Sequence, residues 1–209
     1  MRGHRRAMNQ RLALVTGVTG LHRWPPRAGA ARSRLPGPGD GTGPRRLRDR
    51  AWYDDVEVVE ADAGDARQLR AAMDGVDIAY YLIHSLGTGR RFEARDRHNA
   101  LTFGTAAREA GVPRIVYLGG LYPQGEELSP HLDSRREVGQ ILLASAVPVT
   151  VLHAAVILGS GSASFEMLRH LTNRLAAMVT PRWLCTRIQP IAVRDVLHYL
   201  IGSASMRPT

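Results

Sequence analysis

Short apolar runs alternate along the chain with longer segments in which apolar residues recur at helical spacing. The apolar runs are typical of buried strands and cover residues 12–16, 56–62, 76–84, 114–120, 148–159 and 187–193. The periodic segments predict helices over residues 65–75, 90–111, 134–146, 162–178 and 194–204. Strands that alternate with helices of this length predict βαβ units. We therefore expect an α/β fold with a doubly wound parallel sheet.

Residues 21–44 depart from this pattern where the fold requires the first crossover helix and the second strand. The segment contains five prolines and five glycines, and its only large aliphatic residues are Leu21 and Leu35. Pro25 and Pro26 would break a helix near its start, and the run PGPGDG does not suit a central strand. We therefore expect both elements to be disrupted, with impaired folding and weak cofactor binding in the chain as written.

The reading frame offers an explanation for this segment. Back-translated with GC-rich codons and read one nucleotide later, residues 21–44 can encode a glycine, an amphipathic helix and a strand over the same length. Trp24 has a single codon, which gives glycine in the shifted frame. We interpret the segment as two compensating frameshifts, and the alternative is a genuine Pro/Gly/Arg-rich loop. The chain also ends directly after the last predicted helix, and we expect this carboxyl end to be truncated.

The composition narrows the possible chemistry. The 209 residues, 44% of them hydrophobic, suit one domain over residues 11–204, between a basic extension at 1–10 and a tail at 205–209. All 28 basic residues are arginine, which excludes a Schiff-base lysine, a P-loop lysine and a catalytic Tyr–Lys pair. The single cysteine, Cys185, excludes an internal disulfide and a multi-cysteine zinc site. We expect no bound metal.

The net charge of +9 raises the possibility of a nucleic-acid partner. Arginine, alanine, glycine and proline are the residues of GC-rich codons, however, and no aromatic residues are interleaved with the arginines for base stacking. We therefore do not expect a nucleic-acid partner. No apolar stretch is long enough to span a membrane, and no signal-peptide pattern is present at the start. We expect a cytoplasmic protein with no membrane contact.

The first predicted strand runs into the motif VTGVTG, which contains Gly17 and Gly20. Small residues at this point let backbone N–H groups approach a pyrophosphate at the start of the next helix. A plain tight turn would explain two glycines equally well. Their place after the first strand of a βαβ chain favours dinucleotide binding.

Further motifs follow in the order EADAGD (60–65), AYYLIHS (79–85), RIVYLGGL (114–121) and PHLDSRREVGQIL (130–142). Together with VTGVTG, they resemble the atypical short-chain dehydrogenase/reductases, most closely the NmrA-like, NAD(P)H-binding branch. The resemblance covers residues 11–20 and 51–204. It implies a Rossmann fold that binds NAD or NADP. The two cofactors are not distinguishable, because the strand that presents the ribose-reading residue is the one we expect to be disrupted.

The resemblance implies roles for residues at the strand ends. Gly17, Thr19 and Gly20 would line the pyrophosphate. Asp62 and Ala63 match the family position that touches adenine, although a helix N-cap is an alternative role for Asp62.

Three residues at the end of the 76–84 strand complete the implied cofactor site. Leu82, His84 and Ser85 would flank the nicotinamide riboside. His84 is also a candidate for catalysis, and a hydrogen bond at the strand end is the alternative.

The catalytic positions depart from the family pattern of Ser, Tyr and Lys. Gly119 or Gly120 stands at the serine position, and the cofactor prediction includes Gly119. His131 and Arg135 align with the Tyr-x-x-x-Lys pair. His131 can donate a proton near neutral pH, or can simply be solvated. Arg135 stays protonated and can hold a ribose or lower a neighbour's pKa.

Three hypotheses about function remain at this stage. The first is an NAD(P)-dependent oxidoreductase, or an epimerase-like enzyme, acting on a small molecule. The second is a redox-sensing regulator that binds a dinucleotide without chemistry, which the missing Ser-Tyr-Lys set favours. The third is a decayed product with impaired cofactor binding.

Overall fold

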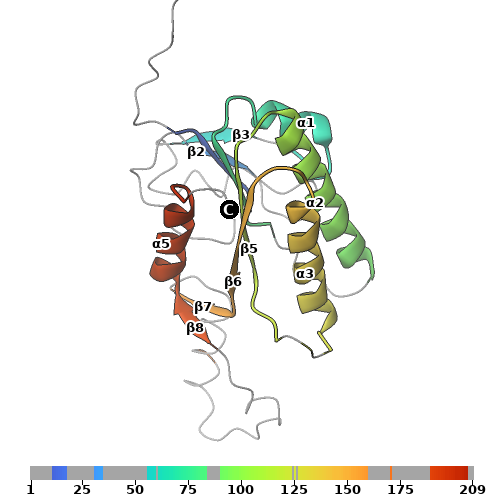
Figure 1. The fold of residues 1–209 in the computed structure, drawn as a ribbon, viewed down its shortest axis with the longest axis vertical. Coiled ribbons are helices and arrows are strands. Elements are labelled where there is room, and N and C mark those ends of the chain that lie inside the picture. The colour runs from blue at the N-terminus through green and yellow to red at the C-terminus, as the bar shows by residue number, and fades with distance from the viewer. Residues whose placement is uncertain are drawn as a thin grey trace, which may run out of the picture.

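A parallel six-stranded sheet runs through the protein in the computed structural model, with helices on both of its faces (Figure 1). The structure describes residues 11–17, 31–34, 56–59, 61–83, 90–123, 125, 127–159, 170 and 189–206. The strands lie in the order β3-β2-β1-β4-β5-β6, and every neighbouring pair is parallel. Their bounds are β1 (Ala13–Val15), β2 (Ala31–Arg34), β3 (Glu57–Val59), β4 (Ile78–Tyr81), β5 (Ile115–Gly120) and β6 (Val149–Ala154). This order confirms the doubly wound α/β fold.

Helices cover the two faces of the sheet unequally. One face carries α1 (Ala66–Ala72), α2 (Arg90–Glu109) and α3 (Pro130–Leu143), and the other carries α5 (Val193–Ser203) (Figure 1). Each face has its own hydrophobic core. Leu69, Phe103 and Leu142 belong to the first core, and Val196 and Leu200 belong to the second. Because both faces of the strands are buried, continuous apolar runs rather than alternating ones form this sheet.

The second strand, which we expected to be disrupted, is present as β2. It pairs with β1 from Ala31 opposite Ala13 and with β3 from Arg32 opposite Glu57. The expectation was wrong because a ladder needs only backbone N–H and C=O groups, and the four residues ARSR contain no proline. The first crossover helix falls in residues 18–30, which lie outside the described part of the chain.

Helix α3 begins four residues earlier than its periodicity indicates. Ser129 caps it by accepting a hydrogen bond from the Leu132 N–H at 3.4 Å, and Pro130 occupies the first helical position. Proline suits that position because its missing N–H would have no helical partner there. The early start places His131 and Arg135 on one helix, beside the carboxyl ends of the strands.

The apolar run at 148–159 forms two strands rather than one. β6 follows β5 up to the hydrogen bond from the Leu121 N–H to the Ala154 carbonyl, at 3.0 Å. Beyond it, β7 (Val156–Leu158) pairs in parallel with β8 (Pro190–Ala192) in a separate two-stranded sheet. The run divides because β5 ends at Gly120 and offers no further backbone groups. The predicted helix at 162–178 lies outside the described residues, except for position 170, which is helical.

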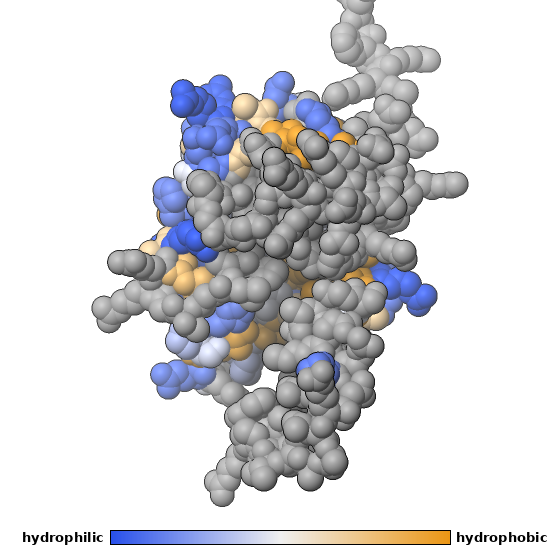
Figure 2. All heavy atoms as spheres, turned by 180° about the vertical axis from the view of Figure 1, so that it is seen from behind, coloured by the Kyte–Doolittle hydropathy of each residue, from blue (hydrophilic) through white to orange (hydrophobic). Residues whose placement is uncertain are grey.

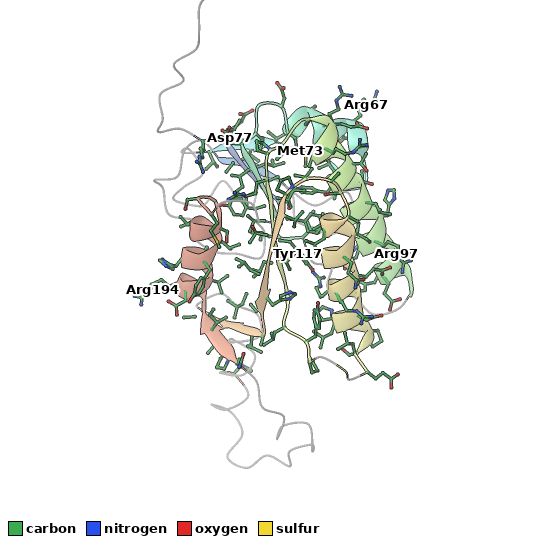
Figure 3. The ribbon with its side chains drawn as sticks, in the orientation of Figure 1. Arg67, Met73, Asp77, Arg97, Tyr117 and Arg194 are labelled. Carbon is green, nitrogen blue, oxygen red and sulfur yellow. The ribbon has the colours of Figure 1, made fainter. Side chains whose placement is uncertain are left out.

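Hydrophilic side chains gather along the edge of the molecule that carries α1 and α2, as the reverse view in Figure 2 shows. Arg67, Arg70 and Arg95 are exposed on these helices. Arg97 of α2 forms a two-pronged ion pair with Glu137 of α3, at 2.7 and 2.9 Å. Figure 3 shows Arg97 on the outer side of these helices and Tyr117 between the sheet and α3.

Candidate functional site

The ends of β1 and β4 lie next to each other where the strand order of the sheet reverses. From this point β2 and β3 continue the sheet on one side, and β5 and β6 continue it on the other. In open α/β sheets such a reversal separates the crossover connections and leaves space for a ligand beyond the carboxyl ends of the strands. The residues that follow β1 and β4 are therefore the first candidates for a binding site.

Gly17 follows the end of β1 in a backbone conformation that only glycine adopts without strain. Its φ is +78°, in the left-handed region. A Cβ at this position would lie 2.4 Å from the carbonyl oxygen of Leu82. The backbones after β1 and β4 are therefore in direct contact, and the structure brings together two of the residues predicted to bind the cofactor. Thr19, Gly20, His84 and Ser85 of the same prediction lie outside the described residues.

Thr16, which the sequence analysis did not identify, joins the ends of β1 and β4. Its N–H and its hydroxyl donate to the Tyr80 carbonyl, at 3.0 and 2.9 Å. The same hydroxyl accepts from the Leu82 N–H at 3.3 Å, and the side chain is fully buried. Thr16 therefore fixes the spacing between Gly17 and Leu82.

We expect Thr16→Val to lower the free energy of unfolding by about 1–3 kcal/mol, because valine keeps the shape and loses both hydroxyl hydrogen bonds. Urea unfolding followed by circular dichroism measures the loss. Thr102→Val is the matched control, since the Thr102 hydroxyl bonds only the His98 carbonyl one turn back in α2, at an exposed site. The control should change stability by no more than about 0.5 kcal/mol. Equal losses in the two variants would show that Thr16 does not join the strands.

Asp62 and Ala63 lie in the turn between β3 and α1. The Asp62 carboxylate accepts from the Gly64 N–H at 2.8 Å, and its backbone carbonyl accepts from the Asp65 N–H at 3.0 Å. The N-cap of α1 is Asp65, so the alternative role of Asp62 as the helix cap is wrong. Backbone N–H groups, first that of Gln68 and then that of Arg67, lower the pKa of the Asp65 carboxyl.

Arg135 is buried within an ion pair rather than open to solvent. Its Nη2 lies 3.2 Å from Oδ2 of Asp96 on α2, and its Nη1 donates to the Ile83 carbonyl at 3.3 Å. The exposed fractions of Arg135 and Asp96 are 6% and 2%. The Ser134 hydroxyl lies 3.4 Å from the same carboxylate oxygen, and the Arg135 carbonyl accepts from the Tyr117 hydroxyl at 3.1 Å. Arg135 thus connects α3 to α2 and to the end of β4.

His131 stands in the first turn of α3 and stacks on Phe92 of α2. The ring centroids are 6.2 Å apart, with an angle of 19° between the planes. Partial burial, and after it the positive charge of Arg135, lowers the pKa of His131, while Asp96 acts in the opposite direction. The ring is therefore neutral at pH 7. Arg135 and His131 lie on the same helix, but only Arg135 reaches the end of a strand in the contacts that the structure shows.

The lowered pKa of His131 predicts a specific pH dependence of stability. Below about pH 6.5 the unfolded chain takes up a proton on this histidine before the folded chain does, so stability falls as the pH decreases through this range. We expect His131→Gln to reduce this fall. Urea unfolding of both proteins at about pH 7.5 and about pH 5.5 measures it. An unchanged fall in the variant would contradict the lowered pKa.

Gly119 lies near the end of β5, in register with His153 of β6. It is buried, and a Cβ at this position would lie 2.9 Å from the ring of Tyr117. Glycine therefore leaves room for that ring. The exposed His153 places its Nδ1 3.0 Å from the Gly120 carbonyl, and its ring contacts the ring of Tyr122.

Besides Thr16, the sequence analysis missed three residues near the strand ends, namely Asp96, Tyr122 and His153. No sequence signal distinguished His153, because it lies in the middle of the strand predicted over 148–159. A signal for Tyr122 was available, because it comes two residues after the predicted strand at 114–120. Nothing in the helical pattern around Asp96 distinguishes it from the exposed charges of the same helix, so only the structure reveals that it is buried.

A family model described as NAD(P)H-binding matches residues 43–170, more than half of the chain. The chain belongs to this NAD(P)H-binding family. The match begins after most of the 21–44 segment and does not include β1. Membership confirms the predicted cofactor class, NAD or NADP. A comparison with curated proteins gives no significant match.

Solved structures with the same fold are similar to this NAD(P)H-binding protein. The Bordetella bronchiseptica enzyme WbmH in complex with NAD+ is 14% identical, with a TM-score of 0.70 over 93% of this chain and 72% of that one. The dTDP-glucose 4,6-dehydratase DesIV from Streptomyces venezuelae, with NAD bound, is 15% identical, with a TM-score of 0.70 over 94% and 73%. The Citrobacter sp. triphenylmethane reductase complexed with NADP(H) is 19% identical, with a TM-score of 0.54 over 77% and 54%. At these identities the likeness shows the fold alone.

None of the described helices combines the length and apolar character that a membrane span requires. Within the described residues, no three His, Cys, Asp or Glu side chains are grouped so that they could hold a metal ion.

Proposed function

We propose that this chain is an NAD(P)H-dependent oxidoreductase that acts on a small carbonyl compound. The observation that carries the proposal is the contact between Gly17 and Leu82 at the reversal of the strand order. Because Gly17 has no side chain, its backbone is accessible at the point where a pyrophosphate approaches a Rossmann sheet. Membership in the NAD(P)H-binding family supports the same cofactor, as do the NAD-bound and NADP(H)-bound proteins of similar fold.

The described residues fit a dinucleotide laid across the carboxyl ends of the strands. Gly17 would present its backbone to the pyrophosphate, and Asp62 and Ala63, after β3, would adjoin the adenine. Leu82, after β4, would adjoin the nicotinamide riboside. The bound cofactor would supply a hydride equivalent to the substrate. Thr19, Gly20, His84, Ser85 and Gly119 complete the proposed binding set.

Arg135 would act as a positioning residue. Its guanidinium is always protonated and therefore cannot exchange a proton with a substrate. It instead fixes the Ile83 carbonyl at 3.3 Å, directly before His84 and Ser85 in the chain. This contact would orient the segment that adjoins the nicotinamide. His131, neutral at pH 7 and stacked on Phe92, would line the entrance to the proposed cofactor site and would not act as the proton donor.

Turnover tests the proposed function. The full chain is incubated with NADPH or NADH and with benzaldehyde, cyclohexanone or menadione, and the absorbance of the reduced nicotinamide is followed. The proposal predicts oxidation that requires both the protein and the carbonyl compound. Saturable dinucleotide binding without oxidation on any of the three compounds would overturn the proposal and would leave the non-catalytic regulator as the function.

A further inference from the structure

His153 is the penultimate residue of β6, and the neighbouring strand does not cover its ring. Its register partner on β5 is Gly119, which has no side chain to extend over it. The ring is exposed at the carboxyl edge of the sheet, the edge on which the proposed oxidoreductase site lies. His153 is thus a titratable side chain at this edge to which neither the motifs nor the comparisons give a role.

A hydrogen bond fixes the tautomer of this ring. Nδ1 of His153 lies 3.0 Å from the Gly120 carbonyl, and a carbonyl oxygen can only accept. Nδ1 therefore carries a hydrogen, which leaves the lone pair of the neutral ring on Nε2. In the protonated ring, Nε2 carries the hydrogen that can be given away, while Nδ1 keeps its bond to Gly120 in both states.

Tyr122 holds the ring of His153 in place. The centroids of the two rings are 5.3 Å apart, with an angle of 87° between the planes, which is an edge-to-face contact. Tyr122 comes two residues after the end of β5, so consecutive parts of one segment provide both the hydrogen bond and the ring contact. A base or acid that is fixed in this manner loses little entropy on reaction.

The other candidates at this edge are less suited to proton transfer. Arg135 does not lose its proton, and Asp96 and Ile83 occupy two of its donor nitrogens. His131 has a lowered pKa and is stacked on Phe92. The family's tyrosine position is filled by His131 itself.

We propose that His153 is the residue that exchanges a proton with the substrate, an inference that rests on the proposed oxidoreductase function. In carbonyl reduction, protonated His153 transfers its Nε2 proton to the substrate oxygen as the carbonyl carbon accepts the hydride equivalent from the reduced nicotinamide. The C=O group becomes an alcohol, the dinucleotide is left oxidised, and neutral His153 regains a proton from water. In the reverse reaction, neutral His153 accepts the alcohol proton at Nε2.

The test compares His153→Gln with the matched variant His198→Gln. His198 on α5 is also exposed and also contacts a tyrosine edge-to-face. The centroid of its ring lies 5.7 Å from the ring centroid of Tyr199. With NADPH and the three carbonyl compounds, His153→Gln should lower kcat by about a hundredfold or more, with little change in the NADPH dissociation constant. His198→Gln should leave kcat unchanged.

A second measurement does not depend on turnover. Proton–nitrogen NMR correlation spectra of the histidine rings, with His153 assigned by its absence in His153→Gln, should show the Nδ1–H tautomer in the full chain without nucleotide. The Nε2–H tautomer would overturn the proposal.

The kinetic outcomes separate the two levels of inference. A wild-type chain that reduces a carbonyl compound, together with a His153→Gln variant within threefold of it, would overturn the role of His153 alone. A wild-type chain that binds NADPH and oxidises it with none of the compounds would overturn the oxidoreductase function and, with it, the role of His153.

Discussion

Replacing Gly17 with alanine should abolish dinucleotide binding and lower the free energy of unfolding by about 3–5 kcal/mol. Two costs combine in this variant. Alanine at a φ of +78° costs about 1–2 kcal/mol. Its Cβ would also lie 2.4 Å from the Leu82 carbonyl oxygen, a backbone atom that moves only if the end of β4 moves. Urea unfolding measures the stability, and titration with NADPH measures the binding.

Gly75→Ala is the matched control for Gly17→Ala. Gly75 follows α1 with a φ of +66°, but nothing lies within 4 Å of a Cβ at this position. The control therefore carries the backbone strain without the collision, and should cost about 1 kcal/mol and leave NADPH binding intact. If Gly17→Ala were no more harmful than Gly75→Ala in both measurements, the close approach of β1 and β4 would not be the basis of the site.

Removing Asp96 should be the second most damaging change. Asp96→Ala leaves the Arg135 guanidinium buried without its counter-charge, which costs about 3–5 kcal/mol. The dependence on Asp96 is strong because the Arg135 Nε, also buried, has no hydrogen-bond partner among the described residues. We expect this loss in urea unfolding, with weaker NADPH binding as the Ile83 carbonyl loses its fixed donor.

The ion pair between Arg97 and Glu137 provides the control for Asp96. It joins the same two helices with a shorter distance, 2.7 Å, but its side chains are 49% and 36% exposed. Glu137→Gln should therefore cost no more than about 1 kcal/mol. The double variant Asp96→Ala with Arg135→Met should recover part of the Asp96→Ala loss, because no unpaired charge remains. A loss in Asp96→Ala no larger than in Glu137→Gln would contradict the burial of this pair.

The sequence predicts the layers of this fold well because burial on both faces makes the central strands, such as β4 and β5, continuous apolar runs. The ends of elements are less predictable, since they depend on contacts that local periodicity does not contain. α3 starts at Pro130 because Ser129 caps it, and the 148–159 run divides because β5 ends at Gly120. β2 was missed because its four residues carry no apolar signal and their backbone groups alone form the ladder.

The candidate site was predictable only where a motif precedes it. The motif after the first predicted strand identified Gly17 as a candidate cofactor-binding residue. The motif at the end of the third predicted strand identified Leu82 in the same way. What each residue contacts could not be derived in this way. From the sequence, Arg135 can hold a ribose or lower a neighbour's pKa, but nothing there indicates that it contacts the carboxylate of Asp96, 39 residues earlier in the chain. His153 acquires its partners only because β5 and β6 are neighbours in the sheet.

Titration of the full chain with NADPH and with NADH tests whether the ends of β1 and β4 form a dinucleotide site. Isothermal calorimetry on the wild-type chain, with Gly17→Ala and Gly75→Ala beside it, reports binding without requiring a substrate. We predict saturable binding of one dinucleotide per chain, lost in Gly17→Ala and kept in Gly75→Ala. A chain that is folded by circular dichroism and binds neither dinucleotide would contradict this prediction.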